Sequence, residues 1–191
     1  MEEYIALKEW AQVIKALDTG NQIILLRKGG INEAKNEFSI RSKEFFLYPT
    51  YEHQREGLLK KWLGEEMEKE TETRKAHNEV EITNFAVVTH IHLLKDANKV
   101  ACLSPYHILN DEYVLSRLAW KPRKPLALML LRVFRLRNPL KLTVLPEYRG
   151  CTSWVELRGE GLTKARNSAE PVLSEDVYCR VVNSIENAIM F

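Results

Sequence analysis

Several features that would assign this 191-residue chain to a familiar class are scarce or missing. It has three cysteines, Cys102, Cys151 and Cys179, and none has the CxxC spacing of a zinc or redox site. We expect reduced thiols, as in a cytoplasmic protein. The longest strongly apolar run, residues 126–131, is far shorter than the roughly 20 residues that span a bilayer. The acidic N-terminus differs from a signal peptide, so we expect no membrane partner.

Glycine-rich phosphate loops are also missing. Gly29-Gly30 follows an apolar stretch, but neither GxxxxGK[ST] nor GxGxxG is present, and a tight turn explains the pair. Hydrophobic residues make up 45% and charged residues 28% of the chain, which is typical of a globular protein. This length predicts a single domain over residues 1–191. Within it, residues 65–81 hold seven Glu against three basic residues, which predicts a charged, flexible segment.

The net charge is only +2, but the basic residues are concentrated in one segment. Between Arg117 and Arg149 there are nine Lys and Arg and a single acid, with aromatic side chains interleaved. Phosphate contact combined with base stacking needs this mixture. The alternative is a solvated basic face that balances the acidic segment. The residues predicted to bind nucleic acid are Trp120, Lys121, Arg123, Lys124, Arg132, Arg135 and Arg137.

Hydrophobic periodicity predicts an α+β protein with a mixed, largely antiparallel sheet covered by helices. Helices are expected over residues 2–17, 51–67, 111–119 and 174–189. Strands are expected over residues 22–27, 45–49, 82–94, 99–103, 126–137, 140–145 and 151–157. On the strand over residues 126–137, Arg132 would lie on a buried face. A buried guanidinium needs a carboxylate or a bound anion as partner.

Two groups of polar side chains are candidates for a site. Thr50 would cap the helix that begins near Tyr51, so that Tyr51, Glu52 and His53 shape a pocket where backbone N–H groups favour an anionic or polar ligand. A capped helix with solvated side chains explains the same pattern. His90 and His92 share one face of the strand over residues 82–94, with Ala86, Val88 and Leu94. They could bind zinc or another divalent ion, with His53 or Glu52 as a third ligand, although a polar sheet surface explains them too.

Four motifs in order resemble the bacterial and archaeal domain-of-unknown-function family 1802. They are residues 6–11, 25–31, 47–54 and 150–157, and the similarity covers nearly the whole chain. Some members carry this domain beside an Mrr-type restriction-endonuclease catalytic domain. The resemblance therefore implies a nucleic-acid setting and a restriction-type nuclease as partner, but no particular activity or cofactor.

A fainter similarity links the segment from Trp10 through Gly20 to Arg27 with ASCH and other PUA-like RNA-binding barrels. It implies that the sheet curls into a barrel. The spacing between Trp10 and Gly20 is longer than that pattern expects, and Gln22 stands where those proteins usually have Lys.

The leading hypothesis is a module that binds DNA or RNA, connected with restriction or another defence system. Its rival is a metal-assisted hydrolase or nuclease, in which His90, His92 and His53 hold a metal and Glu52 acts as general base. A scaffold whose basic segment binds an acidic protein is the third hypothesis. The sequence alone does not show which strands are neighbours, so the order of the strands in the sheet is not predicted. The oligomeric state is not predicted either.

Overall fold

The computed structural model describes residues 3–28, 40–51, 57–60, 78–150 and 152–190. One sheet contains the strands β1 (Tyr4–Trp10), β2 (Ile24–Arg27), β3 (Glu44–Thr50), β4 (Glu79–Leu94), β5 (Leu126–Thr143), β6 (Trp154–Leu157) and β7 (Glu170–Pro171). The helices are α1 (Ala11–Asp18), α3 (Ala97–Ala101), α4 (Asp111–Ala119), α5 (Leu162–Asn167) and α6 (Glu175–Met190), with 3₁₀ turns η3 (Ser104–Tyr106) and η4 (Pro146–Tyr148). In the described part of the chain, no helix has the length and apolar content needed to cross a membrane.

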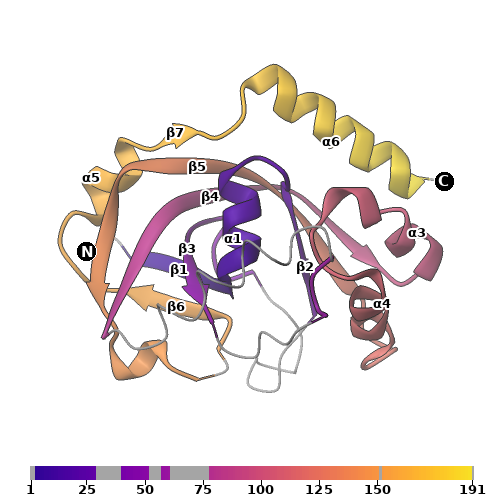
Figure 1. Cartoon of the computed structure of the whole chain (residues 1–191), viewed down its shortest axis with the longest axis horizontal. Coiled ribbons are helices and arrows are strands. Elements are labelled where there is room, and N and C mark those ends of the chain that lie inside the picture. Colours follow the sequence, from indigo (N-terminus) through magenta and orange to yellow (C-terminus); the bar gives the residue numbers. More distant parts are fainter. Residues whose placement is uncertain (1–2, 29–39, 52–56, 61–77, 151, 191) are drawn as a thin grey trace.

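The sheet is strongly curved and has the strand order β2-β5-β4-β3-β1-β6, with β7 added beside β5. β1 and β3 run parallel, and the other neighbouring pairs are antiparallel. Figure 1 shows the long strands β4 and β5 arching over α1, which lies inside the curve. The predicted α+β class with a mixed, largely antiparallel sheet is confirmed.

Both faces of the sheet are buried. On the concave face, Val13 and Leu17 of α1 pack against inward residues of the strands, such as Leu7 and Leu131. On the convex face, α6 covers one end of the sheet together with α3 and α4, while α5 covers the other end. The helix predicted over residues 174–189 is confirmed as α6, and Ile185 at its centre is fully buried.

The helix predicted over residues 2–17 is wrong in its first half. Residues Tyr4–Trp10 form β1, which lies between β3 and β6. Ile5 and Leu7 face the concave core, whereas Ala6 faces the convex side. A strand buried on both faces is apolar at successive positions, and this obscures the period-2 alternation that reveals a half-exposed strand.

Two further predictions around β4 and β5 are wrong. Residues 99–103 are not a strand, because α3 begins after Asp96, whose side chain accepts the Asn98 N–H at 2.8 Å as an N-cap. Residues 140–145 are not a separate strand, because β5 continues past Pro139 to Thr143. The pairing of β5 with β4 shifts register around Pro139. Proline has no N–H to donate, and at such an irregularity the strand does not need that hydrogen bond.

A β-bulge in β4 changes the predicted strand face. The register with β5 shifts between Val88 and His90, so residues 90–94 are displaced relative to residues 86–88. Val88 lies in the concave core, whereas Leu94 packs beneath α6 on the convex side. Cross-strand partners share a face, so His90 and His92 lie on the α6 side with Leu94 and not with Ala86 and Val88 as predicted.

Some predictions fall largely on residues outside the described ranges. These include the Gly29-Gly30 turn, most of the helix over residues 51–67 and most of the segment over residues 65–81. In the described part, residues 57–60 form a turn and an isolated bridge between Leu59 and Leu109, so they are not helical. Residues 79–81 belong to β4 and are not part of a flexible segment.

The turn that ends α1 requires glycine at position 20. Gly20 has φ +73°, and a Cβ added there would lie 2.6 Å from Leu173 Cδ2. Gly150 has φ +83° and nothing within 4 Å of an added Cβ, which makes it a matched control. We expect Gly150→Ala to lower the free energy of unfolding by about 1 kcal/mol through its left-handed backbone alone. Gly20→Ala should lower it by about 2 kcal/mol, because Leu173 must also move. Urea denaturation of both variants measures this difference, and equal losses would contradict the contact with Leu173.

Candidate nucleotide pocket

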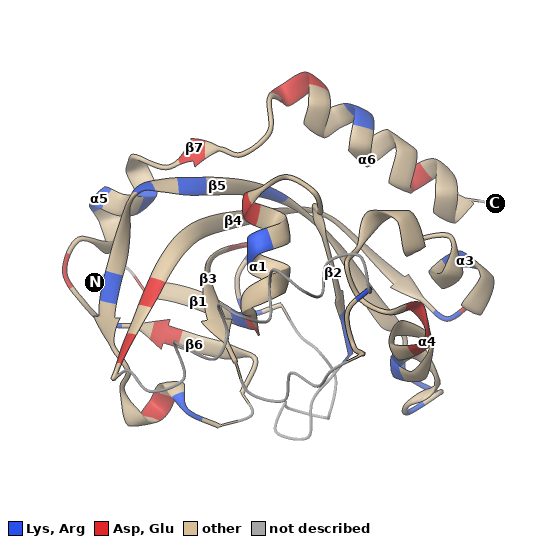
Figure 2. Ribbon diagram, in the orientation of Figure 1, with Lys and Arg blue, Asp and Glu red and all other residues tan. Residues whose placement is uncertain are grey.

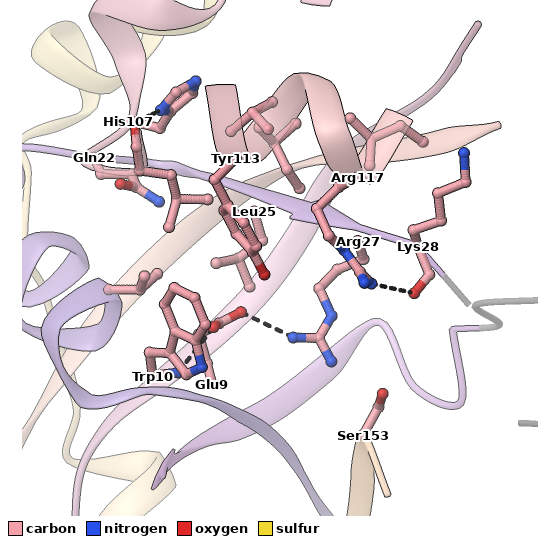
Figure 3. A pocket seen from close by; sticks show the side chains of 15 residues that line it. Glu9, Trp10, Gln22, Leu25, Arg27, Lys28, His107, Tyr113, Arg117 and Ser153 are labelled. Carbon is pink, nitrogen blue, oxygen red and sulfur yellow. Dashed lines mark hydrogen bonds and ion pairs between the residues drawn. The ribbon is translucent and has the colours of Figure 1, made fainter. Parts of the chain in front are cut away.

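A cavity of about 190 Å³ opens between the ends of β1 and β2 and the helix α4. Figure 3 shows the side chains that line it. The charged and aromatic lining residues are Glu9, Trp10, Arg27, Lys28, Tyr113 and Arg117. A volume of this size is below that of typical drug-sized ligand sites, so it would hold only a small ligand or part of a larger one.

A mostly buried ion pair fixes one wall of the pocket. Arg27 Nη1 lies 2.9 Å from Glu9 Oε2, and the side chains are only 17% and 12% exposed. Glu9 Oε1 accepts the Trp10 N–H at 2.8 Å, so both carboxylate oxygens have donors. Arg27 Nη1 also donates to the Lys8 carbonyl at 3.3 Å. The guanidinium is held in one orientation, with β1 as its support.

Two aromatic rings form the adjoining wall. Trp10 and Tyr113 stack with their ring centroids 5.5 Å apart and an interplanar angle of 25°. Burial raises the pKa of the Tyr113 hydroxyl, and the charge of Glu9 acts in the same direction, while Arg117 and Arg27 oppose it. The phenol therefore keeps its proton at neutral pH and can donate a hydrogen bond.

Lys28 and Arg117 bring further positive charge to the pocket. Arg117 Nη2 donates to the Lys28 carbonyl at 3.4 Å, and the Lys28 amine donates to the Leu118 carbonyl. In Figure 3 this amine points away from Glu9 and Arg27. Burial lowers the pKa of Lys28, and the nearby charge of Arg117 lowers it further. Its ammonium form is therefore less stable here than in water, and an anion in the pocket would stabilise it.

The floor of the pocket is closed and uncharged. Leu25 and Leu126 are each 1% exposed, and the polar side chains Gln22 and His107 are 3% and 4% exposed. Gln22 Oε1 accepts the Ile108 N–H at 3.0 Å. Burial, assisted by the charge of Lys60, lowers the pKa of His107 to about 4, so its ring is neutral at pH 7.

A basic loop, residues 120–125, begins at the end of α4 and is linked to the pocket through Arg117. The Arg117 guanidinium lies 4.8 Å from the Trp120 ring centroid, and the Lys121 amine lies 4.2 Å from it. Arg123 is exposed and Lys124 is half-buried. In Figure 2 the basic residues at the end of β2 and after α4 lie on the same side of the molecule. Of the predicted binding residues, Trp120 contacts the pocket residue Arg117, Lys121 contacts Trp120, and Arg123 and Lys124 follow in the same loop.

The predicted arginines of β5 have carboxylate partners. Arg132 Nη2 lies 3.2 Å from Glu175 at the start of α6, and its guanidinium lies over the Tyr178 ring. Glu175 is therefore a carboxylate partner of the kind that a largely buried Arg132 was expected to need. Arg135 Nε pairs with Asp18 at 2.7 Å, and Arg137 Nη2 pairs with Glu170 at 2.8 Å.

The first predicted polar cluster lies only partly within the described residues. Thr50 is the last residue of β3, and its hydroxyl donates to the Glu9 carbonyl at 3.2 Å. Tyr51 has no regular secondary structure, and Glu52 and His53 lie outside the described residues.

The histidines of β4 have separate partners. His92 Nε2 lies 2.6 Å from Glu186 of α6, while His90 Nδ1 lies 3.0 Å from Thr89 Oγ1. Across the described ranges, no three His, Cys, Asp or Glu side chains are grouped closely enough to hold a metal ion.

Sequence reasoning missed most of the pocket. Glu9, Arg27, Lys28 and Tyr113 were not candidates, and Arg117 was counted only in the basic segment. One signal was available, because Arg27 and Lys28 directly follow an apolar strand, and charged residues at a strand end can line a site.

The fold and the pocket define a curved α+β sheet domain with a basic, aromatic-lined cavity at the ends of β1 and β2. The chain belongs to the family described as Domain of unknown function (DUF1802), whose model matches residues 6–184. A comparison with curated proteins gives no match.

Among solved structures, the chain is similar to the ASCH protein of Zymomonas mobilis. The identity is 15% and the TM-score 0.49, over 87% of this chain and 96% of that one. A single-residue variant of the same protein gives 15% identity and a TM-score of 0.49, over 88% of this chain and 100% of that one. At this level of identity the likeness concerns the fold alone.

Proposed function

We propose that this protein is a nucleic-acid-binding module that places one nucleotide of a single strand of DNA or RNA in the pocket. The observation that carries the proposal is the combination, in one cavity, of the stacked Trp10–Tyr113 pair with the guanidiniums of Arg27 and Arg117. Aromatic rings stack on any base, and guanidiniums bind phosphate in a two-pronged geometry.

The neighbouring chain of the nucleic acid would follow the basic loop. Arg117 belongs to both surfaces, since it lines the pocket and lies over the Trp120 ring. Arg123 and Lys124 continue this surface away from the cavity. Their phosphate contacts would give affinity without sequence choice. The arginines of β5 lie outside the pocket lining and pair with Glu175, Asp18 and Glu170, so we assign them a structural role and not phosphate contact.

The salt dependence of nucleic-acid binding tests whether the basic loop, and not β5, contacts the phosphates. We expect the double substitution Arg123→Gln/Lys124→Gln to reduce the slope of log K against log[salt] by about 1.4 for a single strand, because about 0.7 is lost per phosphate contact. The measurement is fluorescence anisotropy of a labelled oligonucleotide of each type, DNA and RNA, at several salt concentrations.

The matched control removes the same charge from β5. Arg135→Gln/Arg137→Gln should change the slope by less than half as much, because these guanidiniums already pair with Asp18 and Glu170. A larger effect from the β5 pair than from the loop pair would contradict this assignment and place the nucleic acid along β5. No binding by the parent protein to any strand would reject the module itself.

We also propose that this module acts together with a restriction-type nuclease. The resemblance of the chain to domains found beside such nucleases supports this setting. Affinity purification of the tagged protein from its native cells, after nuclease treatment to remove bridging nucleic acid, tests it. Recovery without a nuclease subunit would count against the partnership.

A further inference from the structure

The positive charge of the pocket lies inside the cavity wall and not around its mouth. The Arg27 side chain is 17% exposed, and Lys28 is 6% exposed. Arg117, which is half-buried, contacts the Lys28 carbonyl from α4. An anion that binds these groups must therefore enter the cavity.

The closed floor restricts what can enter. Leu25, Leu126, Gln22 and His107 are all less than 5% exposed, so within the described part of the chain they close the inner side of the pocket. A phosphodiester inside a strand carries a nucleotide on each side, and both would have to fit the cavity together. A phosphate at the end of a strand carries only one.

The charges also match a terminal phosphate. The formal charges of Arg27, Lys28 and Arg117 sum to +3, and Glu9, which orients Arg27, reduces the charge of the lining to a net +2. A phosphomonoester carries close to two negative charges at pH 7 and offers three acceptor oxygens, whereas an internal phosphodiester carries one charge. The Arg27 and Arg117 guanidiniums and the Tyr113 hydroxyl all line the cavity, and each is a group that donates to phosphate oxygens.

We propose that the pocket selects the phosphorylated end of a single strand, with the terminal phosphate between Arg27 and Arg117 and the adjoining base against the Trp10–Tyr113 wall. This inference rests on the proposed function and names the ligand of the same site. The chemistry is that of a phosphomonoester, which a 5′ end or a 3′ end can supply. The next nucleotide would reach Trp120, since Arg117 joins the two surfaces.

The test compares short oligonucleotides of one sequence that differ only at their ends. The whole protein is titrated with strands bearing a 5′-phosphate, a 3′-phosphate or hydroxyls at both ends, each as an unlabelled competitor of the same labelled probe. We expect one phosphorylated strand to compete about tenfold better than the unphosphorylated strand, and that strand identifies the end. A nucleoside monophosphate should also compete, whereas the nucleoside should not.

Two variants separate the pocket from the loop. Arg117→Gln should bring the ratio between phosphorylated and unphosphorylated strands close to one. Arg123→Gln should weaken both strands equally and leave the ratio unchanged. Equal competition by all strands with the parent protein would overturn the end preference but leave the nucleic-acid module standing. Failure of every strand to bind would overturn both.

Discussion

Arg27→Ala is expected to lower the free energy of unfolding by about 3 kcal/mol, because the substitution leaves the Glu9 carboxylate buried without its cation. Glu9 is only 12% exposed, and its Oε2 has Arg27 as its partner at 2.9 Å. The remaining donor, the Trp10 N–H, contacts the other oxygen. Urea denaturation at pH 7, followed by circular dichroism, measures the loss.

A double substitution separates stability from binding. Glu9→Leu/Arg27→Met replaces both charges by apolar groups of similar size, and such replacements of buried ion pairs are often neutral or stabilising. We expect its stability to lie within about 1 kcal/mol of the parent protein, whereas its binding to nucleic acid should be lost with Arg27. A stable Arg27→Ala variant would show that Glu9 reaches water. Full binding by the double variant would remove Arg27 from the proposed contacts.

Ile185→Ala is expected to lower the free energy of unfolding by about 3 kcal/mol, because it opens a cavity under the centre of α6. Ile185 is fully buried among Ile24, Leu128 and Leu130 on the convex face. Asn183→Ala is the matched control, since Asn183 lies exposed on the same helix. That variant should stay within about 0.5 kcal/mol of the parent protein.

Urea denaturation, read by circular dichroism and by tryptophan fluorescence, tests this prediction. The two signals should change together if α6 unfolds with the sheet. A loss below about 1 kcal/mol for Ile185→Ala would mean that α6 contributes little to the stability of the domain, because deleting a buried Ile side chain normally costs more.

The parts of the fold that the sequence predicted are those with local signals. The helix α4 has an N-cap at Asn110, and α6 has a long apolar stripe and two acids in its first turn. The first part of β5, residues 126–137, is a long and largely apolar run between Pro125 and Pro139. In each of these elements, local preference and final environment agree, so the pattern predicts the structure.

The errors come from tertiary effects. Pairing with β3 and β6 makes residues 4–10 a strand although their spacing also fits a helix. The bulge after Val88 reverses the face on which His90 and His92 lie, and a bulge without glycine leaves little trace in the sequence. The carboxylate partners of the β5 arginines are residues 18, 170 and 175, which only the fold brings close.

The site was predicted only at its outer edge for the same reason. The basic loop is continuous in the sequence, so its charge and its tryptophan are visible there. The pocket combines Glu9 and Arg27 with Tyr113, which lies about a hundred positions further along the chain. A helix over residues 2–17 gives no reason to pair Glu9 with Arg27, because the ion pair forms where β1 and β2 end side by side.

The position of β1 also affects how the protein is made. β1 is the first strand of the chain, yet it lies between β3 and β6, and its partners in β6 are residues 154–157. A ribosome must therefore synthesise most of the chain before β1 has both neighbours. Until then its apolar face is open to other strands and to chaperones. Because loop closure over such distances is slow, completion of the sheet is expected to be a late step in the maturation of the newly made protein.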